Sequence, residues 1–190
     1  ALQRCKTAKE ALELIGELMT TYGFLPSCIS ESESLVIADP NEAWMFEVVS
    51  VGPGWKKDSG TPGAIWAAQR IPDDHVLIVP NWSVIKEIDI YDTENFKTSE
   101  NYMSFAIDKG WFDPYSGKPF IWQDVYAPVP REWATARFWL FYSTVAPNYA
   151  DWPDRSIKNP YETMNPYIQY VEPLSLYAFS LKPEKKLSVE

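Results

Sequence analysis

Residue types that could act as nucleophiles, general bases or metal ligands are scarce in this sequence. Its 190 residues include one histidine, His75, and two cysteines, Cys5 and Cys28. A Ser-His-Asp triad could be built only around His75, which follows two aspartates and is expected to lie at the edge of a turn. Neither cysteine lies in a local motif, so each is expected to be an ordinary buried thiol. No spacing of histidine, cysteine and carboxylate residues predicts a metal site or any other cofactor site.

Carboxylate and arginine residues could support a different chemistry. Asp73 and Asp74 are neighbours, and neighbouring strand residues point to opposite faces, so a hydrogen-bonded turn is expected there and not a paired acid and base. Glu47 falls among apolar residues of a predicted strand and is expected to be a partly buried carboxylate. Arg70 and Arg137 are its candidate partners, and either could instead bind a substrate carboxylate. A structural ion pair is the usual role of such arginines.

A small antiparallel sheet is predicted to position these side chains. Apolar runs typical of strands cover residues 34–38, 43–51, 64–71 and 75–80. Asp39-Pro40-Asn41-Glu42 has proline at the second position, as in a type I turn, and Pro72-Asp73-Asp74 is a second turn. The run at 75–80 is apolar on both faces, which predicts a central strand. Asn81 follows this run directly, so the pattern predicts an amide side chain at the end of a strand.

Helices are expected to cover this sheet, which gives an α+β fold class. Thr7-Ala8-Lys9-Glu10 has the form of a capping box, and the helix that it starts runs from Ala8 to about Tyr22, with Gly23 at its end. The helical period also covers residues 99–109 and 132–144. Residues 147–173 are rich in Pro, Asn and Tyr and are expected to form long ordered loops.

The composition is that of a globular protein with an acidic surface. The net charge of -9 argues against a nucleic-acid partner, because phosphate binding needs a basic face. No apolar run reaches the ~18 residues of a membrane span, so no membrane partner is expected. Aromatic residues make up 15% of the chain and include nine tryptophans. A row of exposed rings would indicate a carbohydrate- or peptide-binding module, whereas buried rings would indicate an ordinary aromatic core.

Four sequence blocks, taken in order, resemble the PepD-like dipeptidases. The blocks read ALQRCKTAKEALELIGELMTTYGF, ESLVIADPNEAWMFEVV, AIWAAQRIPDDHVLIVPN and ARFW. These dipeptidases are N-terminal-nucleophile (Ntn) cysteine hydrolases, related to secernins and more distantly to penicillin V acylases and bile-salt hydrolases. The blocks cover most of residues 1–145, and the likeness continues weakly to the end of the chain. The resemblance rests on the ordered set of blocks.

The resemblance implies a fold and a reaction. The fold would be part of a four-layer α-β-β-α sandwich, and the reaction would be hydrolysis of a dipeptide amide bond through a thioester. The family's nucleophile is a cysteine at the first position of the mature chain, whose own α-amine serves as the base, so no histidine is needed. Asn81 matches an asparagine that helps form the oxyanion hole in the related acylases, with a turn-capping asparagine as the structural alternative. Arg137 also matches a family position, and it would either place charge near the site or form a salt bridge on a helix surface.

The sequence departs from the family at the nucleophile. It starts at Ala1, while Cys5 and Cys28 match interior parts of the family, so the nucleophile, its base and the first strands are expected upstream. Truncated helix-like patterns at both ends also favour a piece of a longer polypeptide over frayed termini.

We therefore predict one domain, residues 1–190, with a helix and sheet in 1–97 and helices and long loops in 98–190. Its expected partners are a small peptide substrate and the remainder of the parent chain, and the isolated chain is expected to be inactive. An acylase of the same superfamily, acting on a non-peptide amide, is an alternative. The substrate, the formation of a homo-oligomer and the compartment, including export of the parent to the periplasm, stay open.

Overall fold

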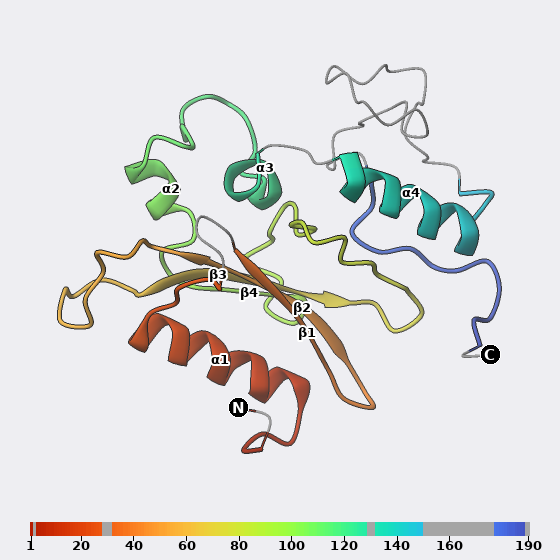
Figure 1. Ribbon diagram of the computed structural model, residues 1–190, viewed down its shortest axis with the longest axis horizontal. Coiled ribbons are helices and arrows are strands. Elements are labelled where there is room, and N and C mark those ends of the chain that lie inside the picture. The colour runs from red at the N-terminus through yellow and green to blue at the C-terminus, as the bar shows by residue number, and fades with distance from the viewer. Residues whose placement is uncertain (2, 28–31, 129–131, 150–176, 189–190) are drawn as a thin grey trace.

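A four-stranded antiparallel sheet forms the centre of the computed structural model, which describes residues 1, 3–27, 32–128, 132–149 and 177–188 (Figure 1). The strands lie side by side in chain order, and they are β1 (Glu33–Ala38), β2 (Ala43–Ser50), β3 (Ala64–Ile71) and β4 (Phe96–Thr98). Helix α1 (Ala8–Tyr22) covers one face of this sheet. The other three helices lie on the opposite side, and they are α2 (Ser104–Asp108), α3 (Trp122–Tyr126) and α4 (Glu132–Val145). The α+β prediction is confirmed, while the second sheet of a four-layer sandwich is not among the described residues.

Helix α1 begins and ends at the predicted residues. Thr7 Oγ1 accepts a hydrogen bond from Glu10 N at 3.1 Å, as in a capping box. The Glu10 carboxylate accepts from Lys6 N, one residue earlier than a capping box requires. Gly23 follows the helix with a φ of +83°, a value that glycine adopts without strain.

The turn between β1 and β2 fixes the start of α1 against the sheet. Asp39 Oδ2 accepts from Ala8 N at 2.7 Å, and Glu42 Oε1 accepts from Lys9 N at 2.9 Å. These two N–H groups belong to the first turn of the helix, which has no partners for them within the helix itself. The carboxylates also complement the positive end of the helix dipole, so the turn and the helix stabilise each other.

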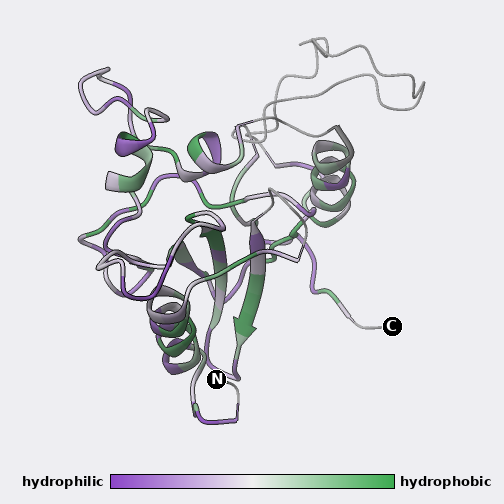
Figure 2. Ribbon diagram, turned by 60° about the vertical axis from the view of Figure 1, so that its left-hand side comes forward, coloured by the Kyte–Doolittle hydropathy of each residue, from purple (hydrophilic) through white to green (hydrophobic). Residues whose placement is uncertain are grey.

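Successive residues of β2 face opposite layers, as expected of a strand. Trp44, Phe46 and Val48 belong to the core cluster under α1, and Met45 belongs to the cluster on the other side. In Figure 2 the strands are among the most hydrophobic parts of the ribbon, and α1 has the mixed colours of an amphipathic helix. The sheet is therefore buried on both faces at β2.

Helix α1 approaches β3 closely at Gly16, which gives a first prediction. A Cβ at this position would lie 2.5 Å from Cζ2 of Trp66. We expect Gly16→Ala to lower the free energy of unfolding by about 1–3 kcal/mol in urea denaturation, because overpacking outweighs the ~1 kcal/mol by which alanine favours a helix. Glu17→Ala, at an exposed position of the same helix, is the control. Equal or higher stability of Gly16→Ala would contradict the close approach.

The run at 75–80, predicted to be a central strand, is not a strand. Val76 alone forms a β-bridge there, with Leu181, and the edge of β3 pairs instead with β4. The run crosses the side of the sheet opposite α1, where residues 76–79 pack against the cluster that includes Met45 of β2 and Phe138 of α4. A segment covered from two sides is apolar at successive positions, so its composition matches that of a buried strand.

Of the two helices predicted on this side of the sheet, one is confirmed and the other is shorter than predicted. The helix at 132–144 is confirmed by α4, whereas the helix at 99–109 is reduced to α2, because turns occupy residues 100–103. Helix α3 was not predicted. The loops predicted at 147–173 lie mostly outside the described residues. No helix within the described ranges is long and apolar enough to cross a membrane.

Candidate active site

Asn81 lies on an irregular segment, residues 80–86, which follows β3 on the side of the sheet opposite α1. Its side chain is exposed, whereas Pro80 and residues 83–85 are buried. It has a φ of +61° and is the one non-glycine residue with a positive φ in the described part of the chain. Such a conformation is uncommon for residues other than glycine, although asparagine adopts it more readily than most, and it is found more often at functional sites. The segment thus presents one amide to solvent from a largely buried stretch.

Arg137 of α4 binds the Asn81 amide. Arg137 Nη1 donates to Asn81 Oδ1 at 2.6 Å, and it lies 3.5 Å from Pro80 O. Two candidates that are 56 residues apart in sequence therefore meet. A guanidinium has only donors, so it fixes the amide with Oδ1 toward Arg137 and Nδ2 on the other side. Among the described residues Nδ2 has no hydrogen-bond partner, so Asn81 offers an N–H donor on an amide that a cation polarises.

Helix α3 holds the backbone that follows Asn81. Gln123 Nε2 donates to Ser83 O at 2.5 Å, and Gln123 N donates to Ile85 O at 3.1 Å. Trp82 donates its indole N–H to a carbonyl just after α3, at 3.3 Å. Although the segment has no regular secondary structure, several of its backbone groups are paired, among them the carbonyls of Ser83 and Ile85, which limits its local motion.

Glu47 of β2 is a buried carboxylate beneath the same segment, with 2% of its surface exposed. Burial raises the pKa of Glu47 above its ordinary value of 4.5, and hydrogen bonds from neighbouring groups, that of Ser83 first, oppose this shift. The predicted arginine partners are wrong. The register pairs Arg70 with Trp44, which places Arg70 on the α1 side of the sheet, away from Glu47. Arg137 binds the amide of the exposed asparagine instead.

His75 has the neighbours of a catalytic triad without its geometry. Its Nδ1 lies 2.8 Å from Ser180 Oγ, and its Nε2 lies 3.8 Å from Asp74 Oδ1. The second distance is too long for a hydrogen bond, and the Asp74 carboxylate pairs with Lys182 at 2.7 Å. His75 therefore lacks the orienting hydrogen bond that a triad base needs.

Cys5 lies on the other side of the sheet from Asn81. It precedes α1 in an irregular stretch, where it is partly buried and packs against the cluster under α1. The sheet therefore separates the Cys5 sulfur from the Asn81 amide. Cys28 lies outside the described residues.

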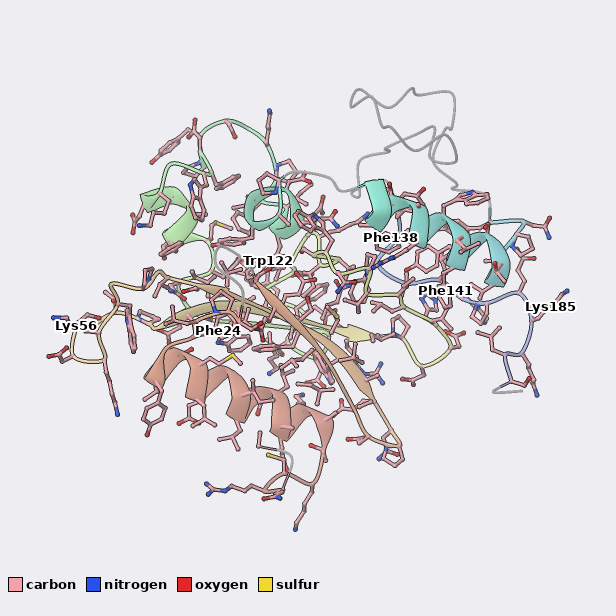
Figure 3. All side chains as sticks on the ribbon, in the orientation of Figure 1. Phe24, Lys56, Trp122, Phe138, Phe141 and Lys185 are labelled. Carbon is pink, nitrogen blue, oxygen red and sulfur yellow. The ribbon has the colours of Figure 1, made fainter. Side chains whose placement is uncertain are left out.

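Most tryptophan rings of the described residues are in the interior or partly covered. Trp44 and Trp122 are fully buried, and Figure 3 shows Trp122 between the sheet and the helices above it. Trp111 is 54% exposed, and Trp55 lines a hollow of about 720 Å³ between the β2–β3 loop and α2. Because most of the described tryptophan rings are covered, they favour a hydrolase-type core over an aromatic binding platform.

Comparison with known proteins decides the family. A family model described as peptidase family C69 matches residues 1–190. The chain belongs to peptidase family C69. Membership confirms the resemblance to PepD-like dipeptidases that the ordered sequence blocks indicated.

The most similar relatives of this C69 chain include proteins described as dipeptidases. It is 30% identical over 100 residues to a probable dipeptidase of Latilactobacillus sakei, a match that covers 53% of this chain and 18% of that protein. It is 30% identical over 109 residues to probable dipeptidase B of Lactococcus lactis subsp. lactis (strain IL1403), covering 57% and 19%. It is 27% identical over 155 residues to a dipeptidase of Bifidobacterium longum (strain NCC 2705), covering 74% and 26%. The matches thus span between 18% and 26% of these relatives' lengths.

Sequence reasoning missed the residues that hold the site of this C69 chain together. Ser83, Trp122 and Gln123 all contact the segment or the carboxylate beneath it, and none was a candidate. The run that contains Trp122 and Gln123 forms a helix of five residues, which is too short to show a helical period. The sequence did place Glu47 among apolar residues. Because a buried carboxylate requires hydrogen-bond donors around it, this position could have indicated that such donors exist.

Proposed function

We propose that this chain is part of a cysteine dipeptidase of the Ntn type. Asn81 would stabilise the oxyanion, Arg137 would orient Asn81, and the nucleophile would lie outside residues 1–190. The observation that carries the proposal is the exposed Asn81 amide, whose Oδ1 is bound by Arg137 while Nδ2 has no partner among the described residues. The relatives described as dipeptidases support the substrate class.

The geometry suits one step of amide hydrolysis in particular. When a thiolate sulfur attacks the carbonyl carbon of the peptide bond, a C–S bond forms and negative charge moves onto the carbonyl oxygen. The Nδ2–H of Asn81 would donate to that oxygen, and the nearby charge of Arg137 would strengthen the donor. The charge returns to form a thioester as the C–N bond breaks and the amine leaves with a proton. Water then attacks the thioester, the same donor stabilises the second oxyanion, and the thiol is released.

The position of Cys5 supports placing the nucleophile elsewhere in the protein. Its packing under α1 puts the sheet between its sulfur and Asn81, and a reacting sulfur must come within about 3–3.5 Å of the carbonyl carbon. The α-amine of an Ntn cysteine would act as the base, which agrees with the absence of an oriented base at His75.

Dipeptide hydrolysis tests this proposal. We expect the protein expressed from the complete reading frame to release amino acids from dipeptides, and we expect iodoacetamide to abolish the activity by alkylating the thiol. Residues 1–190 expressed alone should show no turnover above background. Turnover by residues 1–190 alone would contradict the proposal, and hydrolysis of N-acyl amides without hydrolysis of dipeptides would favour the acylase alternative.

A further inference from the structure

We infer that Glu47 is a positioning residue for the oxyanion donor, because its buried carboxylate binds residues 83–85, which begin two positions after Asn81, and thereby fixes where the Asn81 amide points. The inference rests on the proposed role of Asn81. Glu47 lies in the interior of the sheet and would affect the reaction through Asn81, without contacting the substrate.

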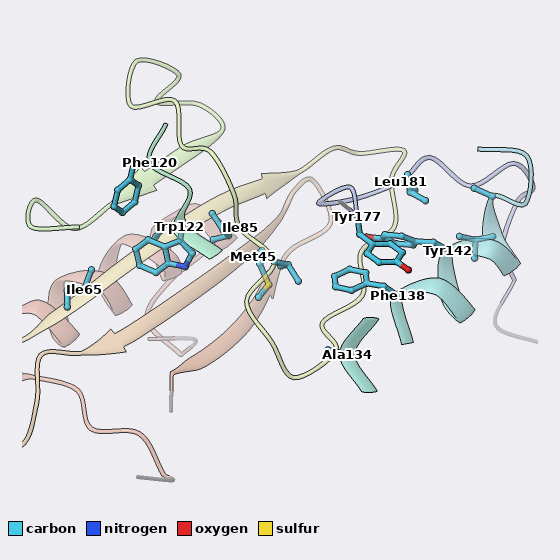
Figure 4. Close-up of a cluster of buried hydrophobic side chains, with 14 of the residues drawn as sticks. Met45, Ile65, Ile85, Phe120, Trp122, Ala134, Phe138, Tyr142, Tyr177 and Leu181 are labelled. Atoms are coloured by element: carbon cyan, nitrogen blue, oxygen red, sulfur yellow. The ribbon is translucent and has the colours of Figure 1, made fainter. Parts of the chain in front are cut away.

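The carboxylate of Glu47 joins two elements that are distant in sequence. Its Oε1 accepts from Val84 N at 2.6 Å and from Ile85 N at 3.2 Å, and its Oε2 accepts from Ser83 Oγ at 2.5 Å and from Trp122 Nε1 at 2.7 Å. Figure 4 shows Trp122 and Ile85 next to each other, between Ile65 of β3 and Met45 of β2. One side chain of β2 therefore binds three consecutive residues of the segment and one residue of α3.

These contacts use the full accepting capacity of a carboxylate. Two carboxylate oxygens offer about four lone-pair sites, and each of them meets a donor here. Within the described residues Glu47 forms no ion pair, so the donors alone compensate its burial. A charge buried in this way is costly unless every donor stays in place. The arrangement therefore tolerates little displacement of residues 83–85.

The tethered residues control the position of Asn81 through a short length of chain. Ser83 is two residues after Asn81, a span of at most about 7 Å of backbone. On the other side, Pro80 O and the Asn81 amide are held by Arg137. Asn81 thus lies between two anchors, with a positive φ that is uncommon among residues other than glycine. If the hydrogen bonds to Glu47 are lost, the backbone at Asn81 can relax, and its Nδ2–H then no longer points at the oxyanion.

Two conservative variants of the complete protein test the inference. Glu47→Gln keeps the shape but places an amide N–H2 against the indole N–H of Trp122, and Trp122→Phe removes that indole donor while keeping a ring. We expect Glu47→Gln to lower kcat for a dipeptide about tenfold with KM within about twofold, and Trp122→Phe to lower kcat by a smaller factor, because misplacement affects the transition state more than substrate binding. Hydrogen exchange of residues 80–86 should be faster in both variants.

A destabilised variant at a distance separates positioning from a general loss of stability. Leu12 is fully buried under α1, on the other face of the sheet, so Leu12→Ala should lower the unfolding midpoint and leave kcat and exchange of residues 80–86 unchanged. Unchanged exchange of residues 80–86 in Glu47→Gln would overturn the inference, as would a normal kcat in an active protein. Absence of turnover in the wild type would instead overturn the proposed function. The hydrogen bonds between Glu47 and residues 83–85 would then have no role in catalysis.

Discussion

Replacing Asn81 by glycine is expected to lower kcat for dipeptide hydrolysis by about a hundredfold or more, since the loss of one oxyanion donor costs about 10²–10³ in rate. Glycine is the informative substitution because Asn81 has a φ of +61°, a conformation that glycine adopts without strain. The variant therefore removes the amide and preserves the backbone. Steady-state kinetics of the complete protein measure the effect, which should appear in kcat with little change in KM.

Two further substitutions at this position distinguish catalysis from structure. Asn81→Asp keeps the shape and the acceptor for Arg137 but puts an oxygen where Nδ2 was, so its kcat should be at least as low as that of Asn81→Gly. Asn81→Ala should combine the loss of activity with a lower unfolding midpoint than Asn81→Gly, because alanine is strained at a positive φ. Normal kcat in the glycine and aspartate variants, with lowered stability, would show that Asn81 only terminates a turn.

Local rules were sufficient to predict much of the fold from the sequence. The apolar run at 43–51 predicted β2, and the capping pattern at Thr7 placed the start of α1 at Ala8. Both signals depend on residues within a few positions of each other, and burial on the two faces of the sheet agrees with them. The predicted α1, β1, β2 and β3 all follow from such short-range patterns.

The environment of the site could not be predicted in this way. The run at 75–80 has the composition of a central strand, and only its tertiary position, across the sheet and next to α4, shows why it is not one. The contact between Asn81 and Arg137 spans 56 residues, and the contact between Glu47 and Trp122 spans 75. Asn81 and Arg137 were assigned to the site separately, by resemblance, and nothing in the sequence predicted that their side chains contact each other. Arginine partners were predicted for Glu47 because a buried carboxylate commonly pairs with a cation. Its actual partners are uncharged N–H and O–H donors, which the sequence does not reveal.

Replacing Glu47 by leucine is expected to cause the largest loss of stability, about 3–5 kcal/mol in the free energy of unfolding at neutral pH. The substitution leaves two backbone N–H groups, an indole N–H and a hydroxyl without their acceptor in the interior, and each unsatisfied buried donor costs about 1–3 kcal/mol. Relief of the buried charge and the apolar surface of leucine offset part of this cost. Urea denaturation measures the effect, with Leu35→Ala on the exposed part of β1 as a control. A loss below about 1 kcal/mol would show that water replaces the carboxylate as acceptor.

The pH dependence of stability then reports the charge state of Glu47. Burial raises the folded-state pKa of Glu47 above the ordinary 4.5, so the stabilisation from its protonation is complete below pH 4.5 and is lost as pH rises through the folded-state pKa. Glutamine does not titrate, and the other ionisable groups are the same in both proteins. The unfolding free energy of the wild type minus that of Glu47→Gln should therefore fall as pH rises above 4.5 and become constant beyond the folded-state pKa. A difference that instead grows with pH would mean that the four hydrogen bonds to the carboxylate outweigh its burial, and that the folded protein favours the charged form.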